Sequence, residues 1–137
     1  MKKVLFIASE CVPFIKTGGL ADVVGSLPKC FDKKYFDVRV ILPKYMCMKE
    51  EFKSKLEYIT HFYMDLGWRS QYVGVLGMNY DGIQYYFIDN EFYFAGPKPY
   101  GNIYEDIEKF AFFSKAALSI LPDINFRPDI IHCHDWQ

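Results

Sequence analysis

Apolar and polar residues in the first third of the chain follow the order of a strand, a loop, a helix and a second strand. Residues 4–8 (VLFIA) form a continuous β-branched and aromatic run, as expected for a strand buried on both faces. Apolar residues recur at helical spacing from Leu20, so a helix is expected there, directly after two glycines, and it should end or kink at Pro28. Residues 36–43 (FDVRVILP) are again mostly apolar. This succession predicts a βαβ unit with a right-handed crossover.

The middle of the chain has a pattern typical of antiparallel strands. Residues 57–90 hold three segments rich in β-formers, and Asp81-Gly82 separates the second from the third. This dipeptide is a strong hairpin signal because glycine accepts positive φ. We therefore expect a β-meander over these residues. The preceding segment MKEEFKSKLEYI, which starts at Met48, is compatible with a short helix or with the approach to a strand.

The last third predicts an ordered loop, a long helix and a final strand. Residues 91–104 combine glycine, proline and aromatic residues, as in an ordered loop. Asn102 followed three residues later by Glu105 resembles a capping box, and the helix that it starts should stop at Pro122. Residues 130–131 (II) begin another strand, which we expect to be buried. The residues expected on one helical face are Ile107, Phe110, Ala111, Ser114, Ala117, Leu118 and Leu121.

The composition is that of a chain able to bury a hydrophobic core. Of 137 residues, 51% are hydrophobic, and they include 13 Phe, 11 Tyr and 2 Trp, which excludes a disordered chain. The net charge of −1 argues against a basic protein that binds nucleic acid. The length fits one domain or a part of a larger one. Together with the element order, this predicts an α/β, Rossmann-like fold with a mostly parallel sheet and an inserted β-meander.

Cysteine spacing and hydropathy indicate the surroundings in which the chain works. The four cysteines include no C-x-x-C pair, so the spacing of a zinc ribbon is absent. The apolar run at residues 4–8 is too short for a signal peptide, and no run approaches the ~20 apolar residues of a membrane span. We therefore expect a cytoplasmic, reducing environment and no membrane partner.

The first candidate site is the segment Lys16-Thr17-Gly18-Gly19, which lies between the first strand and the first helix. Backbone N–H groups at a helix N-terminus attract phosphate, and a lysine adds a full charge. The segment is neither a Walker A loop nor G-x-G-x-x-G, because its glycines have other spacings. A purely structural turn is the alternative interpretation.

The second candidate site is His132-Cys133-His134-Asp135 at the end of the last strand. The two histidines should point to the same side of the strand, as metal ligands do. The metallo-hydrolase pattern H-x-H-x-D-H is not met, however, so we expect no metal and favour a substrate-facing histidine. The alternative is a histidine that only packs or hydrogen-bonds at the strand end. Ser9-Glu10 follows the first strand, and the carboxyl ends of parallel strands form the ligand-binding edge of open α/β sheets. We expect these segments and the glycine loop to share one rim.

Two long segments, SECVPFIKTGGLADVVGSLP near the start and PDIIHCHDWQ at the end, resemble the bacterial glycogen/starch synthase family. The segments DVRVILPKY, YYFIDNEFYF and EKFAFFSKAAL extend the resemblance over essentially the whole chain. It implies a retaining glycosyltransferase with two Rossmann domains, which transfers glucose from ADP-glucose to the non-reducing end of an α-1,4-glucan without a cofactor. It also implies that residues 1–137 are a truncated N-terminal, acceptor-side domain and that the nucleotide-binding C-terminal domain is absent.

The resemblance further implies roles for individual residues. Lys16 would contact the donor pyrophosphate and sugar, and His134 would sit over the transferred glucose; these two are the implied catalytic residues. Gln137 stands where many relatives have a further histidine, which removes one expected contact. The implied substrate-binding residues are Lys16, Gly18, Gly19, Asp22, Glu10 and either Glu105 or Asp106, between which the local alignment does not choose.

Three other functions fit part of the pattern. A related enzyme that uses a UDP-sugar stays open, because the base-reading residues would lie outside these residues. A non-catalytic glucan-binding fragment also stays open, and we expect the 137 residues alone to lack synthase activity. A nicotinamide-dependent oxidoreductase is disfavoured because G-x-G-x-x-G is missing.

Overall fold

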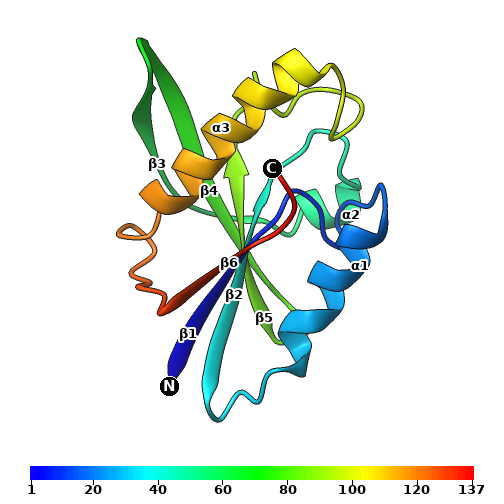
Figure 1. The fold of residues 1–137 in the computed structure, drawn as a ribbon, viewed down its shortest axis with the longest axis vertical. Helices are drawn as coiled ribbons and strands as arrows, with labels where there is room; N and C mark the ends of the chain where they lie inside the picture. Colours follow the sequence, from blue (N-terminus) through cyan, green and yellow to red (C-terminus); the bar gives the residue numbers. More distant parts are fainter.

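The computed structural model describes all residues from 1 to 137 and is built around one six-stranded sheet with helices on both faces (Figure 1). The helical elements are α1 (Gly19–Ser26), the 3₁₀ turn η1 (Leu27–Cys30), α2 (Glu50–Lys53) and α3 (Ile103–Ser119). The strands are β1 (Lys2–Ile7), β2 (Phe36–Pro43), β3 (Glu57–Leu66), β4 (Arg69–Tyr80), β5 (Ile83–Asp89) and β6 (Ile130–Cys133).

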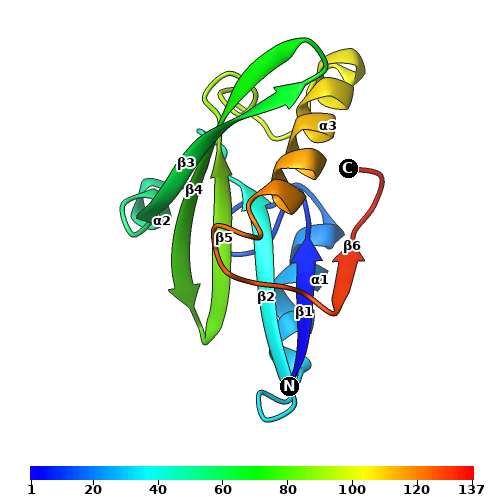
Figure 2. The same ribbon diagram turned by 90° about the vertical axis from the view of Figure 1, so that its left-hand side faces the viewer.

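The strand order is β3-β4-β5-β2-β1-β6, and Figure 2 shows the strands side by side in this order. β2 pairs in parallel with β1 and β5, and β1 pairs in parallel with β6. β4 runs antiparallel to both of its neighbours. The predicted Rossmann-like, mostly parallel sheet with a β-meander is therefore confirmed. The meander β3-β4-β5 is part of the same sheet, because its last strand lies beside β2.

The turns and breaks of the chain fall largely where the sequence predicts them. Asp81 and Gly82 both have positive φ, 49° and 80°, as the tight hairpin between β4 and β5 requires. The α-helical part of the first helix ends at Ser26, and Pro28 lies within the tighter turn η1 that follows. The undecided segment after Met48 contains the single helical turn α2.

The predicted capping box at the start of α3 is only half correct. The Asn102 side chain does cap the helix, accepting a hydrogen bond from the amide of Tyr104 at 2.9 Å. Glu105 does not supply the reciprocal bond: the carboxylate that reaches back belongs to Asp106, which accepts from the amide of Gly101 at 3.0 Å. Asp106 can do so because it lies on the inner face of α3, whereas Glu105 faces solvent.

The buried face of α3 also differs from the prediction. Phe110 and Ala117 are buried as expected, but Ile107 and Leu118 are about half exposed. The two adjacent phenylalanines at 112 and 113 fill the space against the sheet and rotate the buried face away from the predicted one. The buried residues of α3 are Asp106, Lys109, Phe110, Phe112, Phe113, Ala116 and Ala117.

The expectation that β6 is a buried strand is wrong. All four of its residues are exposed, Ile130 by 52% and Ile131 by 42%. The reason is its position: β6 is the last strand in the order and pairs only with β1. An apolar pair identifies a strand, but not whether that strand lies at an edge.

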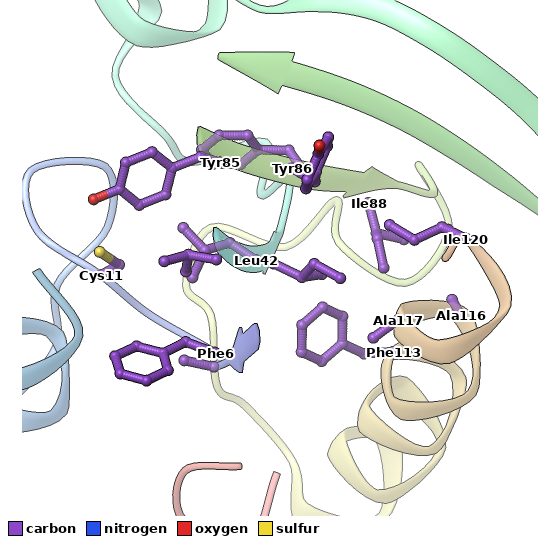
Figure 3. Close-up of a cluster of buried hydrophobic side chains, with 14 of the residues drawn as sticks. Phe6, Cys11, Leu42, Tyr85, Tyr86, Ile88, Phe113, Ala116, Ala117 and Ile120 are labelled. Carbon is purple, nitrogen blue, oxygen red and sulfur yellow. The ribbon is translucent and has the colours of Figure 1, made fainter. Parts of the chain in front are cut away.

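The hydrophobic core occupies both faces of the sheet. Figure 3 shows Phe6, Cys11 and Tyr85 on one side, and Ile88 and Phe113 on the other, next to α3. Successive residues of a strand point to opposite faces, so each face receives its own apolar layer.

Phe14 extends this core into the loop between β1 and α1. Its ring is 2% exposed and meets four other aromatic rings at centroid distances of 4.8 to 5.4 Å. Those four rings are Phe52, Tyr80, Tyr85 and Phe87. The loop that carries the candidate site is therefore attached to the core at its middle. No helix in the chain combines the length and the apolar character needed to cross a membrane.

Candidate functional site

The carboxyl ends of β1 and β6 lie side by side and bring the two predicted motifs to one rim. In the parallel register Ile7 pairs with Cys133, so Ser9 and Glu10 leave the sheet beside His134. The glycine loop follows Glu10 and leads into α1 at the same edge. The predicted common rim is thus present.

Glu10 is the most heavily hydrogen-bonded side chain at this rim. It is 2% exposed, and its Oε1 accepts from the amide of Gly18 at 3.2 Å. Its Oε2 accepts from the amide of Thr17 at 3.1 Å and also from the Thr17 hydroxyl. The Tyr100 hydroxyl donates to the same oxygen at 3.3 Å. Glu10 therefore faces the protein's own glycine loop.

The two glycines begin α1 in different ways. Gly18 is the residue before the helix, with an extended backbone and no side chain to cap it, and its amide is bonded to Glu10. Gly19 is the first helical residue. The amides of the first helical turn have no partner within the helix, so from Gly19 onward they are available to an anion.

Lys16 and Asp22 form an ion pair across the start of α1. The Lys16 ammonium lies 2.8 and 3.0 Å from the two carboxylate oxygens of Asp22. Both side chains are about half exposed. The lysine is thus held over the first turn of the helix, in water-accessible surroundings where such a pair contributes little to stability.

A second loop closes the other side of the glycine loop. A hollow of about 420 Å³ lies between Lys16 and Thr17 on one side and residues 97–100 on the other. The Tyr100 hydroxyl forms a 2.6 Å hydrogen bond with the Ser9 hydroxyl, and burial raises its pKa to about 12. Tyr100 was not predicted as a site residue; its place in a Gly/Pro loop was the only signal for it.

His134 packs among rings at the end of β6. Its centroid lies 4.3 Å from that of His132 and 5.3 Å from that of Phe6, so the two histidines share one side as predicted. Burial, and then the neighbouring His132, lower the pKa of His134 below its usual 6.5. The Nε2 atom of His134 is buried and has no hydrogen-bond partner. Such an atom is suited to a hydroxyl of a bound molecule.

Asp106 and Glu105 have different surroundings, although the alignment did not choose between them. Asp106 is 4% exposed and lies 3.4 Å from the Lys109 ammonium, which also donates to the carbonyl of Pro99. This pair of side chains thereby links α3 to the loop that carries Tyr100. Glu105 is exposed and lines a separate hollow of about 490 Å³.

The segment after β6 returns to the same region. The Trp136 ring packs edge-on against Phe110 at 5.7 Å, and Phe110 also contacts Tyr100 at 5.9 Å. The Ser114 hydroxyl donates to the Gln137 carbonyl at 3.1 Å. Residues 134–137 are therefore held against α3, close to the loop beside Glu10. No group of three His, Cys, Asp or Glu side chains comes together as a metal site would require.

A mostly parallel sheet with a glycine loop, a helix N-terminus and polar residues along one carboxyl edge defines a Rossmann-like α/β protein. Within this class the chain belongs to the family described as starch synthase catalytic domain, which it matches over residues 3–137.

The relatives support this membership over the full chain. The chain is 73% identical over 137 residues to the glycogen synthase of Lachnoclostridium phytofermentans and 70% identical to that of Lachnospira eligens. All of this chain is covered in both comparisons, but only 29% of each relative. The catalytic domain of starch synthase IV from Arabidopsis thaliana, bound to ADP and acarbose, has a TM-score of 0.80 at 33% identity. That likeness covers 98% of this chain and 28% of the solved one.

Proposed function

We propose that the protein containing this chain is a glycogen synthase that transfers glucose from ADP-glucose to the non-reducing end of an α-1,4-glucan, with retention. We further propose that residues 1–137 are part of its N-terminal, acceptor-side domain and that a C-terminal nucleotide-binding domain of the same protein completes the site. The protein would work in the cytoplasm. The observation that carries the proposal is family membership over residues 3–137, together with a glycine loop that ends at a helix N-terminus.

In this proposal the start of α1 receives the donor diphosphate. Cleavage of the donor leaves negative charge on ADP, and preorganised amides and cations stabilise charge that develops in the transition state. The amide of Gly19 and the ammonium of Lys16 are the groups at this position. Asp22 would hold Lys16 over the helix until the phosphate shares it. The amide of Gly18 would contribute less than expected, because Glu10 already accepts its hydrogen.

His134 would orient the glucose that is transferred. Its lowered pKa keeps the imidazole neutral at pH 7, so one ring nitrogen can donate a hydrogen bond to a sugar hydroxyl and the other can accept one. Holding the anomeric carbon next to the acceptor hydroxyl accelerates transfer by fixing orientation. Asp106 would act by keeping the Tyr100 loop in place, and Glu105 would face the separate hollow of about 490 Å³.

The assignment of Lys16 is tested in the protein at the full length of its relatives. Lys16→Ala should lower kcat by about 100-fold or more, the size of loss seen when one preorganised donor is removed. The matched control is Lys55→Ala, an exposed lysine away from the rim, which should leave kcat unchanged. Near-normal turnover of Lys16→Ala would exclude the role proposed for this lysine.

Donor choice is tested separately. The proposal expects a much higher kcat/KM for ADP-glucose than for UDP-glucose in the same full-length protein. The reverse order would replace ADP-glucose by a UDP-sugar and leave the reaction class intact. For residues 1–137 alone, we expect no transfer and only weak binding of ADP-glucose by calorimetry, so tight binding would contradict the need for a second domain.

A further inference from the structure

The unusual feature of Glu10 is that it is a buried carboxylate held entirely by neutral donors. Its bonds come from the amides of Thr17 and Gly18 and from the hydroxyls of Thr17 and Tyr100. No lysine, arginine or histidine forms an ion pair with it. Burying a charge is costly unless hydrogen bonds replace its water. These bonds therefore hold the carboxylate and the glycine loop in one arrangement.

The donors come from two loops that are distant in the sequence. Thr17 and Gly18 directly precede the first helical amide, while Tyr100 belongs to the loop on the far side of the 420 Å³ hollow. Glu10 itself follows β1: the Ala8 amide donates to Ile41 of β2 at 3.2 Å, and the Ser9 carbonyl accepts from the Tyr45 hydroxyl, just after β2, at 2.7 Å. The carboxylate thus connects the rigid sheet to both walls of the hollow.

The pattern of acceptors requires a carboxylate at this position. Oε1 accepts from Gly18, whereas Oε2 accepts from Thr17 and Tyr100. A glutamine has one acceptor oxygen and one NH₂ group, which can only donate. Whichever way the side-chain amide of a Glu10→Gln variant is turned, its NH₂ would face an N–H of the loop. An isosteric amide should therefore disturb the loop, although it keeps the size of the side chain.

We propose that Glu10 is a positioning residue: it does not touch the substrate but holds Thr17 and Gly18 so that Lys16 and the Gly19 amide meet the donor diphosphate. This differs from the role implied by the resemblance, in which Glu10 lines the substrate site. The inference deepens the proposed function and rests on it for the identity of the ligand. Its structural part, the fixing of the loop, can be tested without that ligand.

The experiment compares the full-length protein with its Glu10→Gln variant. We expect Glu10→Gln to weaken ADP binding in calorimetry by about tenfold or more, the effect of losing a hydrogen bond to a charged group. KM for the glucan should stay unchanged. Hydrogen exchange of the Thr17 and Gly18 amides should become faster. Glu51→Gln, on the exposed surface of α2, is the matched control and should change none of these quantities.

The outcomes separate the two proposals. Unchanged ADP affinity and unchanged exchange at Thr17 and Gly18 in folded Glu10→Gln would overturn the positioning role. If the wild type binds no ADP but exchange in the variant is faster, the loop-holding role stands and the donor assignment fails. If Glu10→Gln does not fold, Thr17→Val removes one donor: faster exchange at Gly18 with weaker ADP binding supports the role, and no change in either refutes it.

Discussion

Gly25 in α1 offers a substitution whose effect should be opposite to the usual one. In an exposed helix, replacing glycine by alanine stabilises the fold by about 1 kcal/mol. Here a Cβ on Gly25 would lie 2.3 Å from Cγ2 of Val12 and 2.9 Å from its carbonyl oxygen. Because Gly25 has no side chain, α1 can pack closely against the loop that follows Glu10. We expect Gly25→Ala to destabilise the protein.

The size of the effect follows from which neighbour can move. The Val12 side chain can change rotamer, but its backbone is held because its amide donates to the Ala21 carbonyl at 3.0 Å. Overpacking a rigid contact costs about 1–3 kcal/mol, and the helix propensity of alanine returns about 1 kcal/mol. The expected net loss in the free energy of unfolding is up to about 2 kcal/mol.

Urea unfolding of the 137-residue chain, followed by circular dichroism, measures this loss as a lower midpoint at constant m. Gly101→Ala is the control, because a Cβ there meets nothing within 4 Å. The double variant Val12→Ala/Gly25→Ala should recover part of the loss, since it removes the nearer contact but leaves the carbonyl. A midpoint for Gly25→Ala at or above that of the wild type would refute the close approach.

Three further predictions concern single side chains. NMR titration of His134 should give a pKa below 6.5 in the folded protein, and a pKa of 6.5 or more would contradict its burial. With a lowered folded pKa, the contribution of His134 to stability is complete above pH 6.5 and is lost as the pH falls through the folded value. Cys30 and Cys133 are exposed and should react with a thiol reagent in the native protein, but Cys11, whose pKa burial raises to about 12, should react only after denaturation. Asn102→Ala should lower the free energy of unfolding by about 1 kcal/mol, and Asn102→Asp should restore most of it; equal stability of all three would exclude the cap.

The elements that could be predicted from the sequence are those that depend on residues close together in the chain. The strand at 36–43, the Asp81-Gly82 hairpin and the helix after the two glycines each follow from local spacing or turn chemistry, and the structure contains them. The order of strands does not follow from local spacing, so the exposure of β6 at the sheet edge was not foreseen. The buried face of α3 was misjudged because Phe112 and Phe113 are equally apolar and only the sheet decides between faces.

The candidate site shows the same division. That the ends of β1 and β6 meet was predictable, because parallel strands share a carboxyl edge. The partners of Glu10 were not, since Tyr100 lies 90 residues further along the chain and only the folded loops bring the two together. Asp106, rather than Glu105, bonds the backbone before α3, accepting from the amide of Gly101, because its position on α3 turns it inward.

The insertion of Phe14 among four aromatic rings has a consequence for motion at the site. A loop of this length would ordinarily sample many conformations, and binding would have to select one of them at an entropic cost. With its midpoint packed in the core, and with Thr17 and Gly18 bonded to Glu10, the loop keeps little freedom even in the short stretch from Lys16 to Gly19. Rearrangements there should be rapid and small, whereas any larger opening would require the Phe14 ring to leave the interior. The loop is thus a largely preformed binding site.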